Sequence, residues 1–394
     1  MAAAPASSIP KAVSAGAKNR RIYQIMEWMS YGDAATNITR ENARLLAGLG
    51  YQTRIYAHES DPRVANEATS LRHLRPDSGD PIILHYCGYS HIEDFIESYP
   101  GPRAVHFHNI TPAQYFDPKS PLFDFTNRGY AQLRRIAGLF DLVMADSVFD
   151  LVEYARHLLQ PRPTLCIPPL IEAERIRRRP VDKARREQLA SLAGDKFVFV
   201  GRVAPNKRHD LLMCAFDEYC RMIRRDAYLF LVGSHGQSDS FYHALQRLRA
   251  GLPSGDRIIF TGHVTDEELA AYYEAGDAFI CASEHEGFGV PLVEAMAYEM
   301  PVIAFNSSAV PEAMGDAGIL VHTWDTVNVA ELMNLAVHDQ QLRDHIVNKQ
   351  TQSLSRFSRP AVERALNAAI EFLCDGRESP ELVWRGPDMD SNPQ

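Results

Sequence analysis

The sequence predicts an α/β protein of two doubly wound domains that face each other across a cleft. Short apolar, β-branched runs alternate with segments of helical periodicity, which is the pattern of parallel sheets covered by helices. The alternation stops once, in a charged stretch after residue 168, and then restarts. The chain has 394 residues, which is too long for one ordinary hydrophobic core.

The first domain is expected at residues 20–172. It opens with an apolar strand at 21–26, a loop at 27–33 and a helical repeat at 36–49. The same alternation predicts strands at 51–57, 82–86, 104–108, 142–145 and 164–167, and helices at 91–98, 120–139 and 148–159. Residues 1–19 are rich in Ala, Ser and Pro without an apolar core, so they predict a disordered tail and not a signal peptide.

A linker is expected at residues 173–195, where Pro168 and Pro169 are followed by a run rich in Arg and Glu. Such a run indicates a solvated helix more than a binding patch. The second domain is expected at 196–356, with strands at 197–203, 228–232, 257–260, 278–281, 302–305 and 319–321. Helices at 330–338, 342–354 and 361–373 follow. Segment 357–376 is expected to pack back on the first domain, and 377–394 to form a loose tail.

Composition excludes several classes of protein. The formal charge of −9 argues against nucleic acid as a partner, because phosphate backbones bind basic surfaces. The six cysteines form no Cys-x-x-Cys pair, so neither a zinc site nor a disulfide framework is indicated, and a reducing cytoplasm fits. No apolar run reaches the length of about 18 residues that a membrane span requires.

The stretch 277–305 predicts a strand, a glycine-containing loop, a helix and another strand. The loop brings free amides and the carboxylates of Glu286 and Glu294 to the carboxyl edge of the sheet, where α/β proteins bind ligands. A dinucleotide fingerprint is the first alternative, but Leu292 stands at its third glycine position, which disfavours a nicotinamide-dependent oxidoreductase. The second alternative is that both glutamates simply face solvent.

Two cations follow the first strand of the second domain. Gly201 allows the turn, and Arg202 and Lys207 leave the same sheet edge near a helix start. The segment is not a P-loop, because Asn206 precedes the lysine and no Ser or Thr follows it. Two cations at this place suit a diphosphate, whereas either alone would be read as a solvated loop residue.

In the first domain, the loops at equivalent strand ends contain Gly32-Asp33 and His108. A histidine there can donate to a substrate or shuttle a proton, although a ring that bonds only loop backbone is the simpler alternative. No metal site is expected. The Asp388-Met389-Asp390 pattern lies in the polar tail, and the adjacent side chains of Glu284-His285-Glu286 point different ways on an extended loop.

Together these motifs resemble the retaining glycosyltransferases of the GT4 family, which have the GT-B fold of two Rossmann-like domains. The Glu-x7-Glu motif falls on Glu286 and Glu294, and the Gly-Arg-x4-Lys motif on Gly201, Arg202 and Lys207. The resemblance covers roughly residues 20 to 375. It implies catalysis without a metal or other cofactor, with the diphosphate leaving group taking the acceptor's proton.

The resemblance also implies roles for single residues. Arg202 and Lys207 would hold the diphosphate, Glu294 the ribose hydroxyls, and His108 the sugar from the opposite domain. Donor contacts are implied for Glu286 and for the residues around it, namely Gly287, Phe288, Gly289 and Val290. Val264 would lie in the base-binding loop. Gly32 and Asp33 stand where many relatives carry two glycines, so a phosphate or acceptor contact there stays open.

The substrates are expected from the same resemblance. The combination of Gly32-Asp33-Ala34 with 108–112 is similar to bacterial mannosyltransferases that build exopolysaccharide or O-antigen units on polyprenyl diphosphate. GDP-mannose is therefore the expected donor and a lipid-linked saccharide the expected acceptor, with another nucleotide sugar such as a UDP-sugar, or a non-catalytic binding protein, as alternatives. The helix segment 130–140 allows peripheral contact with the inner membrane, although core packing is its simpler role.

Overall fold

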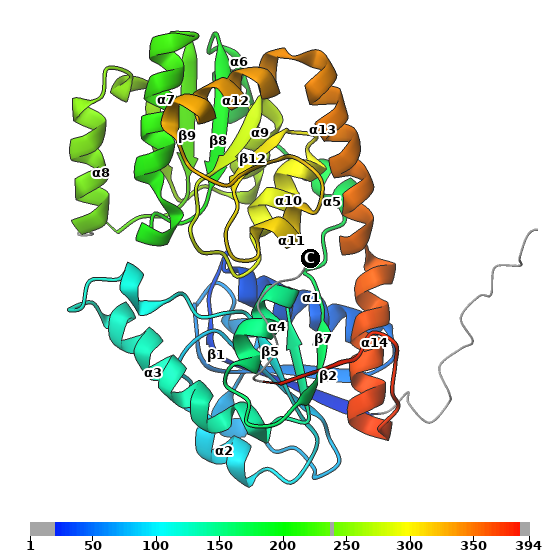
Figure 1. The fold of residues 1–394 in the computed structure, drawn as a ribbon. Coiled ribbons are helices and arrows are strands. Elements are labelled where there is room, and N and C mark those ends of the chain that lie inside the picture. The colour runs from blue at the N-terminus through cyan, green and yellow to red at the C-terminus, as the bar shows by residue number, and fades with distance from the viewer. Residues whose placement is uncertain (1–19, 237–239, 387–394) are drawn as a thin grey trace, which may run out of the picture.

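A computed structural model describes residues 20–236 and 240–386 of the chain. These residues form two αβα domains stacked one above the other, as the sequence predicts (Figure 1). The predicted tail 1–19 and the Asp388–Asp390 pattern lie outside the described residues. Among the described helices, none combines the length and the apolar character needed to cross a bilayer.

The first domain contains a sheet in the order β14-β7-β6-β5-β4-β1-β2-β3, parallel except for β14. Its strands are β1 (Arg21–Met29), β2 (Gln52–Ser60), β3 (Thr69–Ser70), β4 (Ile82–Tyr86), β5 (Arg103–Phe107), β6 (Leu142–Ala145), β7 (Arg162–Cys166) and β14 (Val383–Arg385). Its helices are α1 (Ala34–Gly48), α2 (Glu93–Ser98), α3 (Pro121–Ile136), α4 (Val148–Ala155) and α14 (Arg359–Asp375), with 3-10 turns at Ala65–Glu67, Leu71–His73, Ala113–Tyr115 and Ala137–Leu139.

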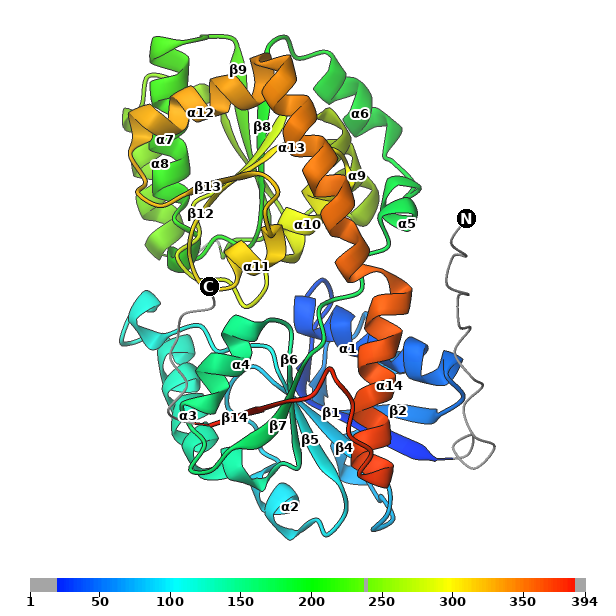
Figure 2. The same ribbon diagram turned by 45° about the vertical axis from the view of Figure 1, so that its right-hand side comes forward.

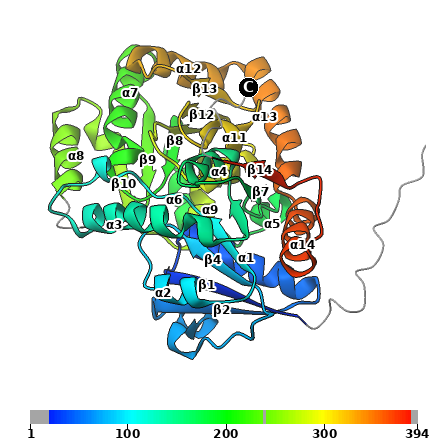
Figure 3. The same cartoon turned by 60° about the horizontal axis from the view of Figure 1, so that its bottom comes forward.

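Helices cover both faces of this sheet. Viewed from the first-domain end, α1 and α14 lie on one side and α2 and α3 on the other (Figure 3). The apolar side of α3 is buried, with Leu133 at 0% and Ile136 at 1% exposure, because it packs on the sheet. These side chains therefore have a core role and are not available to a membrane surface.

The second domain contains a parallel sheet in the order β10-β9-β8-β11-β12-β13. Its strands are β8 (Asp195–Val200), β9 (Ala227–Val232), β10 (Ile258–Gly262), β11 (Ala278–Cys281), β12 (Val302–Phe305) and β13 (Ile319–Val321). Its helices are α5 (Ala173–Arg177), α6 (Lys183–Ala190), α7 (His209–Met222), α8 (Ser240–Gly251), α9 (Asp266–Ala275), α10 (Val290–Ala297), α11 (Val310–Met314), α12 (Thr326–His338) and α13 (Gln340–Ser353), with 3-10 turns at Pro205–Lys207, Gly255–Arg257 and Leu354–Phe357.

Two segments differ from the sequence prediction. The expected linker 173–195 forms α5 and α6, whose Ile176 and Leu189 are buried in the core of the second domain. The expected loose tail contains β14, which pairs antiparallel with β7 and closes the edge of the first sheet (Figure 2). Both misses have one cause, since a few apolar side chains in polar surroundings gave too weak a periodic signal.

The chain crosses between the domains twice. It passes from β7 into α5, and it returns from α13 into α14, which lies along the first domain (Figure 2). Contacts across the domains join the two crossings, among them the backbone N–H of Ile171, which donates to the carbonyl of Phe357 at 2.9 Å. Loops that follow β5 of the first sheet and β8 and β9 of the second line one pocket, so the carboxyl ends of the two sheets face the same cleft.

Candidate active site in the cleft between the domains

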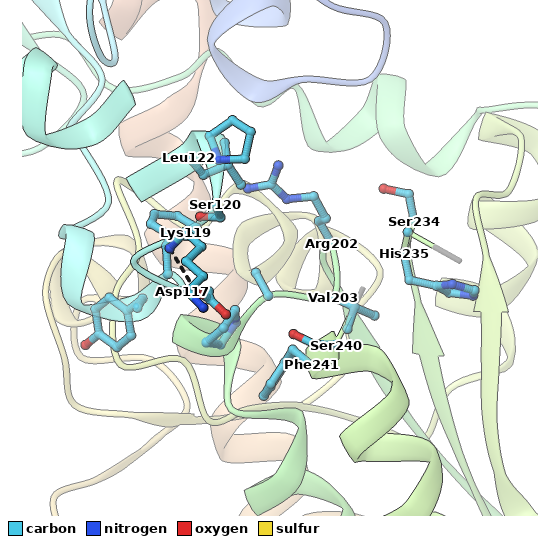
Figure 4. A pocket seen from close by; sticks show the side chains of 16 residues that line it. Asp117, Lys119, Ser120, Leu122, Arg202, Val203, Ser234, His235, Ser240 and Phe241 are labelled. Atoms are coloured by element: carbon cyan, nitrogen blue, oxygen red, sulfur yellow. Dashed lines mark hydrogen bonds between the residues drawn. The ribbon is translucent and has the colours of Figure 1, made fainter. Parts of the chain in front are cut away.

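A pocket of about 710 Å³ lies between the two domains. The first domain contributes the segment from Tyr115 to Leu122, between β5 and α3, and the second contributes residues after β8 and β9, including Arg202 and His235. In Figure 4, Arg202 points from its loop toward the wall that Ser120 and Leu122 form, whereas His235 turns away. The His235 ring stacks on Tyr242 with 3.8 Å between the ring centroids.

Two cationic side chains line this pocket from opposite domains. Lys119 comes from the turn before α3, and Arg202 comes from the loop after β8. Among the described residues, neither side chain forms an ion pair or a hydrogen bond with another side chain. An unpaired cation pair across a cleft favours an anionic ligand, because a guanidinium and an ammonium both bind phosphate oxygens.

Lys207 does not share this arrangement. Its ammonium forms a short ion pair with the carboxylate of Glu286, and both side chains are largely buried. The lysine of the Gly-Arg-x4-Lys motif and the first glutamate of the Glu-x7-Glu motif therefore lie together, as an ion pair. A diphosphate bound by both Arg202 and Lys207 would require Lys207 to exchange its carboxylate partner for a phosphate oxygen.

Hydrogen bonds to Asn206 and Ser308, in two neighbouring loops, hold the loop before α10. Asn206 accepts from the N–H of Glu284 at 2.8 Å through its backbone and donates through its side chain to the carbonyl of His285 at 2.9 Å. The N–H of Glu286 donates to the hydroxyl of Ser308 at 2.8 Å. Asn206 thus ties the loop after β8 to the loop after β11, a role that the sequence did not reveal.

Two glycines set the path of this loop. A Cβ at Gly287 would lie 2.7 Å from the carbonyl oxygen of His108, so only glycine allows the two domains to approach so closely here. Gly289 has φ of +90° and precedes α10, whose first residues are Val290 and Pro291. Phe288 is buried and packs against Phe357, which leaves only its backbone for a donor sugar.

Glu294 faces a second, smaller hollow of about 270 Å³ that also contains Val290. One carboxylate oxygen pairs with Arg179 at 2.8 Å, and the other accepts from the hydroxyl of Tyr273 at 3.1 Å. Ribose hydroxyls would compete with these donors. Arg179 belongs to the charged run that the sequence analysis assigned to a solvated helix, and its proximity to Glu294 could not be derived from spacing.

The remaining predicted contacts of the donor side lie in turns at the sheet edge. Gly201 follows β8 directly, and Val264 lies in the turn between β10 and α9. In the first domain, Gly32 lies in the turn after β1, and Asp33 is the N-cap of α1, where its carboxylate accepts from the N–H of Thr36 at 2.9 Å. Asp33 thus places its own negative charge where a helix N-terminus would otherwise attract a phosphate.

His108 is enclosed in the first domain. Its Nδ1 donates to Asp146 at 2.7 Å, and its Nε2 lies 2.9 Å from Nδ1 of His85, so both ring nitrogens are engaged. The side chain is only 4% exposed. The expected contact between this imidazole and a sugar would need one of these bonds to break, and the part of His108 that reaches the second domain is its carbonyl group.

A hydrogen-bonded network surrounds His108. Asp146 also accepts from Nε2 of His106 at 2.9 Å, and Nε2 of His85 lies 2.9 Å from the amide oxygen of Gln24. Burial alone would raise the pKa of Asp146, but His108 and His106 outweigh it and hold that pKa well below its usual range. Burial, together with the neighbouring rings, lowers the pKa of His85 and His106.

Metal ligands are available in two places among the described residues. His85, His106 and His108 form one group, and Glu27, His58 and His91 form another. In the first group, the rings of His85 and His108 are parallel within 7° and joined by the hydrogen bond described above. In the loop before α10, Glu284 pairs with Arg208 and Glu286 with Lys207, so these carboxylates face different cations.

Comparison with known proteins assigns the class. Residues 181–353 match the family model described as "Glycosyl transferases group 1", so this segment of the second domain is similar to the domains of that family. The whole fold is that of the GT-B glycosyltransferases. It matches sucrose-phosphate synthase from Thermosynechococcus elongatus, with a TM-score of 0.70 at 17% identity over 91% of this chain and 100% of that chain.

Two further matches name substrates of other proteins. The O-antigen chain mannosyltransferase B of Escherichia coli is 29% identical over 161 residues, which is 41% of this chain and 42% of that protein. The structure of Anabaena Alr3699/HepE in complex with UDP-glucose aligns with a TM-score of 0.68 at 16% identity, over 89% and 99% of the two chains. The chain spans about half or less of the length of the curated relatives it matches.

Proposed function

We propose that this protein transfers a hexosyl group from a nucleotide sugar to an acceptor hydroxyl with retention of the anomeric configuration. The observation that carries the proposal is the pair of unpaired cations, Arg202 and Lys119, which line a pocket between two GT-B domains. A departing diphosphate gains negative charge as the glycosidic bond breaks. Positioned cations that neutralise this charge lower the barrier without a protein nucleophile.

The loop before α10 would hold the sugar. Glu286 and the amides at Phe288 and Gly289 lie at the sheet edge, and the loop rests against the backbone of His108 through Gly287. The hydrogen bonds around Asp146 would fix the backbone of His108, because Asp146 accepts from both His106 and His108 inside the first domain. Closure of both domains over the donor would exclude water, which otherwise hydrolyses the activated sugar. No step of this scheme requires a metal.

For the substrates, we propose GDP-mannose as donor and a polyprenyl-diphosphate-linked oligosaccharide as acceptor, in exopolysaccharide or O-antigen assembly. The resemblance of 108–112 to such enzymes and the similarity to an O-antigen mannosyltransferase support this choice. An acceptor of this kind would bring a cytoplasmic protein to the inner membrane as a peripheral partner. A UDP-sugar donor is the alternative, favoured by the structural similarity to a protein that binds UDP-glucose.

The test offers GDP-mannose and UDP-glucose separately, each with a polyprenyl-diphosphate-linked saccharide, and follows the product by chromatography and by NMR of the anomeric proton. We expect transfer from GDP-mannose with the α configuration kept. Arg202→Ala should lower kcat/KM about 100- to 1,000-fold, the usual loss when one charge-stabilising donor is removed. Arg247→Ala, an exposed arginine on α8, is the matched control and should leave kcat/KM unchanged.

Two results would contradict the proposal. Equal activity of Arg202→Ala and the wild type would show that the pocket does not hold the leaving group. Nucleotide-sugar binding with neither transfer nor hydrolysis would identify the protein as a non-catalytic binding protein instead.

A further inference from the structure

We propose that Glu27, His58 and His91 bind one transition-metal ion of the zinc type at the carboxyl edge of the first-domain sheet. The three residues come from the carboxyl ends of three neighbouring strands. Glu27 is near the end of β1, His58 is near the end of β2, and His91 lies in the loop that follows β4. Their ligand atoms all lie within 4.8 Å of one another.

The strand register brings the first two ligands together. Met26 is paired with Ala57 and Trp28 with Glu59, so Glu27 lies directly beside His58 in the parallel ladder. Neighbouring residues in register project to the same face of a sheet. The loop after β4, the strand on the other side of β1, then brings His91 over Glu27, and the rings of His58 and His91 lie 4.5 Å apart between centroids.

The two oxygens of Glu27 have separate partners. Oε2 accepts from the hydroxyl of Ser90 at 3.1 Å and from the N–H of His91 at 2.8 Å, which fixes the carboxylate. Oε1 faces the two imidazoles, at 2.6 Å from Nδ1 of His91 and 3.7 Å from Nδ1 of His58. A carboxylate that is anchored through one oxygen and presents the other is the arrangement that orients metal ligands.

These distances nearly match a metal site. Tetrahedral coordination with bonds of about 2.0 to 2.1 Å places ligand atoms about 3.3 Å apart. The ring of His91 needs to retreat slightly and that of His58 to approach, and both can turn because their side chains are 55% and 34% exposed. Two imidazoles and one carboxylate suit zinc and its neighbours, and the open side leaves positions for water or for an anionic oxygen.

The buried group of His85, His106 and His108 is the less suitable candidate. There His85 and His108 bond directly to each other at 2.9 Å, and Asp146 takes the other nitrogen of His108. A metal would have to break these bonds inside a packed core. In the Glu27 group only the bond between Nδ1 of His91 and Oε1 of Glu27 would have to give way, and the ring of His91 is 55% exposed. The side chain of His58 has only Glu27 as a polar partner among the described residues.

The experiment measures metal binding by the full chain after treatment with a chelator and removal of the chelator. Calorimetric titration with Zn²⁺ should give one equivalent per chain, and titration with Co²⁺ should give the visible absorption of a tetrahedral site that Zn²⁺ then abolishes. His58→Ala and His91→Ala should each weaken Zn²⁺ binding more than about tenfold, since even residues that only support metal ligands change affinity by 10- to 100-fold.

The matched control is His345→Ala, which removes an exposed histidine on α13 and should bind Zn²⁺ like the wild type. Circular dichroism of each variant checks that the fold is kept. Zinc binding that His58→Ala and His91→Ala leave unchanged, or the absence of any stoichiometric binding, would overturn the proposal. The measurement uses the metal alone, so its outcome is independent of whether the protein transfers a sugar.

Discussion

The carboxyl edges of the two parallel sheets meet at one cleft, yet their polar groups are arranged in different ways. In the first domain, the histidines at this edge are buried and bonded to one another around Asp146. In the second domain, Lys207 and Glu286 pair with each other in the loops after β8 and β11, and Arg202 has no side-chain partner among the described residues. The first edge is therefore a fixed support, and the second can exchange its partners for a ligand.

The buried histidines of the two domains also differ in their hydrogen bonds. In the first domain, the ring nitrogens of His106 have Asp146 at 2.9 Å and the amide of Asn42 at 3.5 Å as partners. In the second domain, His209 at the start of α7 is fully buried, and neither ring nitrogen has a hydrogen-bond partner among the described residues. The same residue type thus stabilises one domain and costs free energy in the other.

The largest expected effect comes from removing Asp146. Asp146→Ala leaves His106 and His108 without their shared acceptor in a buried site, and breaking a buried charged network typically costs about 3 to 5 kcal/mol. We expect the free energy of unfolding in urea to fall by that amount. Asp94→Asn, at an exposed position of α2, should change it by less than about 0.5 kcal/mol. Equal stability of the two variants would show that the network is not a structural support.

His209→Leu is expected to act in the opposite direction. Burial, and then Lys207, lower the pKa of His209 to about 3, below its usual value near 6.5. Because the folded protein holds this ring neutral, the free energy of unfolding is highest above about pH 6.5 and falls as the pH drops toward 3. At pH 5 the loss is about 2 kcal/mol, because each pH unit below 6.5 costs about 1.4 kcal/mol.

Urea unfolding at pH 7.5 and pH 5 measures this effect. His209→Leu should lose about 2 kcal/mol less than the wild type between the two values, and it should also be more stable at pH 7.5 because two unpaired nitrogens are removed. His345→Ala, at an exposed position, should keep the pH dependence of the wild type. A wild-type pH dependence in His209→Leu would mean that the buried ring is not what titrates.

The sequence predicted the architecture because the alternation of short apolar strands and helices is strong. Gly287, Gly289 and Pro291 also predicted the loop and the helix start before α10, since their backbone preferences are local. The hydrogen-bond and ion-pair partners of the charged groups could not be predicted from the sequence in this way. Asp146 follows a predicted strand directly and could have been noticed there, but its position beside His106 depends on the register of β5 against β6.

Arg179 shows the limit most clearly. It stands in a run of arginines and glutamates where no spacing distinguishes one cation from the next, and only the path of the chain after α5 brings it to Glu294. Likewise, the pairing of Lys207 with Glu286 joins residues 79 positions apart in the sequence. Which charges meet is a tertiary property, whereas which charges lie at a sheet edge follows from the local pattern.

The smallest expected effect concerns the contact that joins the two edges. Glu312, on α11 of the second domain, accepts from the N–H groups of Val148 at 2.7 Å and Phe149 at 2.5 Å and so caps α4 of the first domain. Removing a cap typically costs about 1 kcal/mol. Glu312→Ala should therefore lower the free energy of unfolding by about that amount, whereas Glu331→Ala, on the exposed side of α12, should have almost no effect.

The pH dependence of this contact separates it from an ordinary cap. Burial raises the pKa of Glu312 above its usual value, although the N–H groups of Val148 and Phe149 oppose the shift. A group whose pKa is raised in the folded state contributes stability at low pH that is lost as the pH rises through that pKa. The cost of Glu312→Ala should accordingly be larger at pH 4 than at pH 7.5. An equal cost at both values would show that the pKa of Glu312 is not raised in the folded protein.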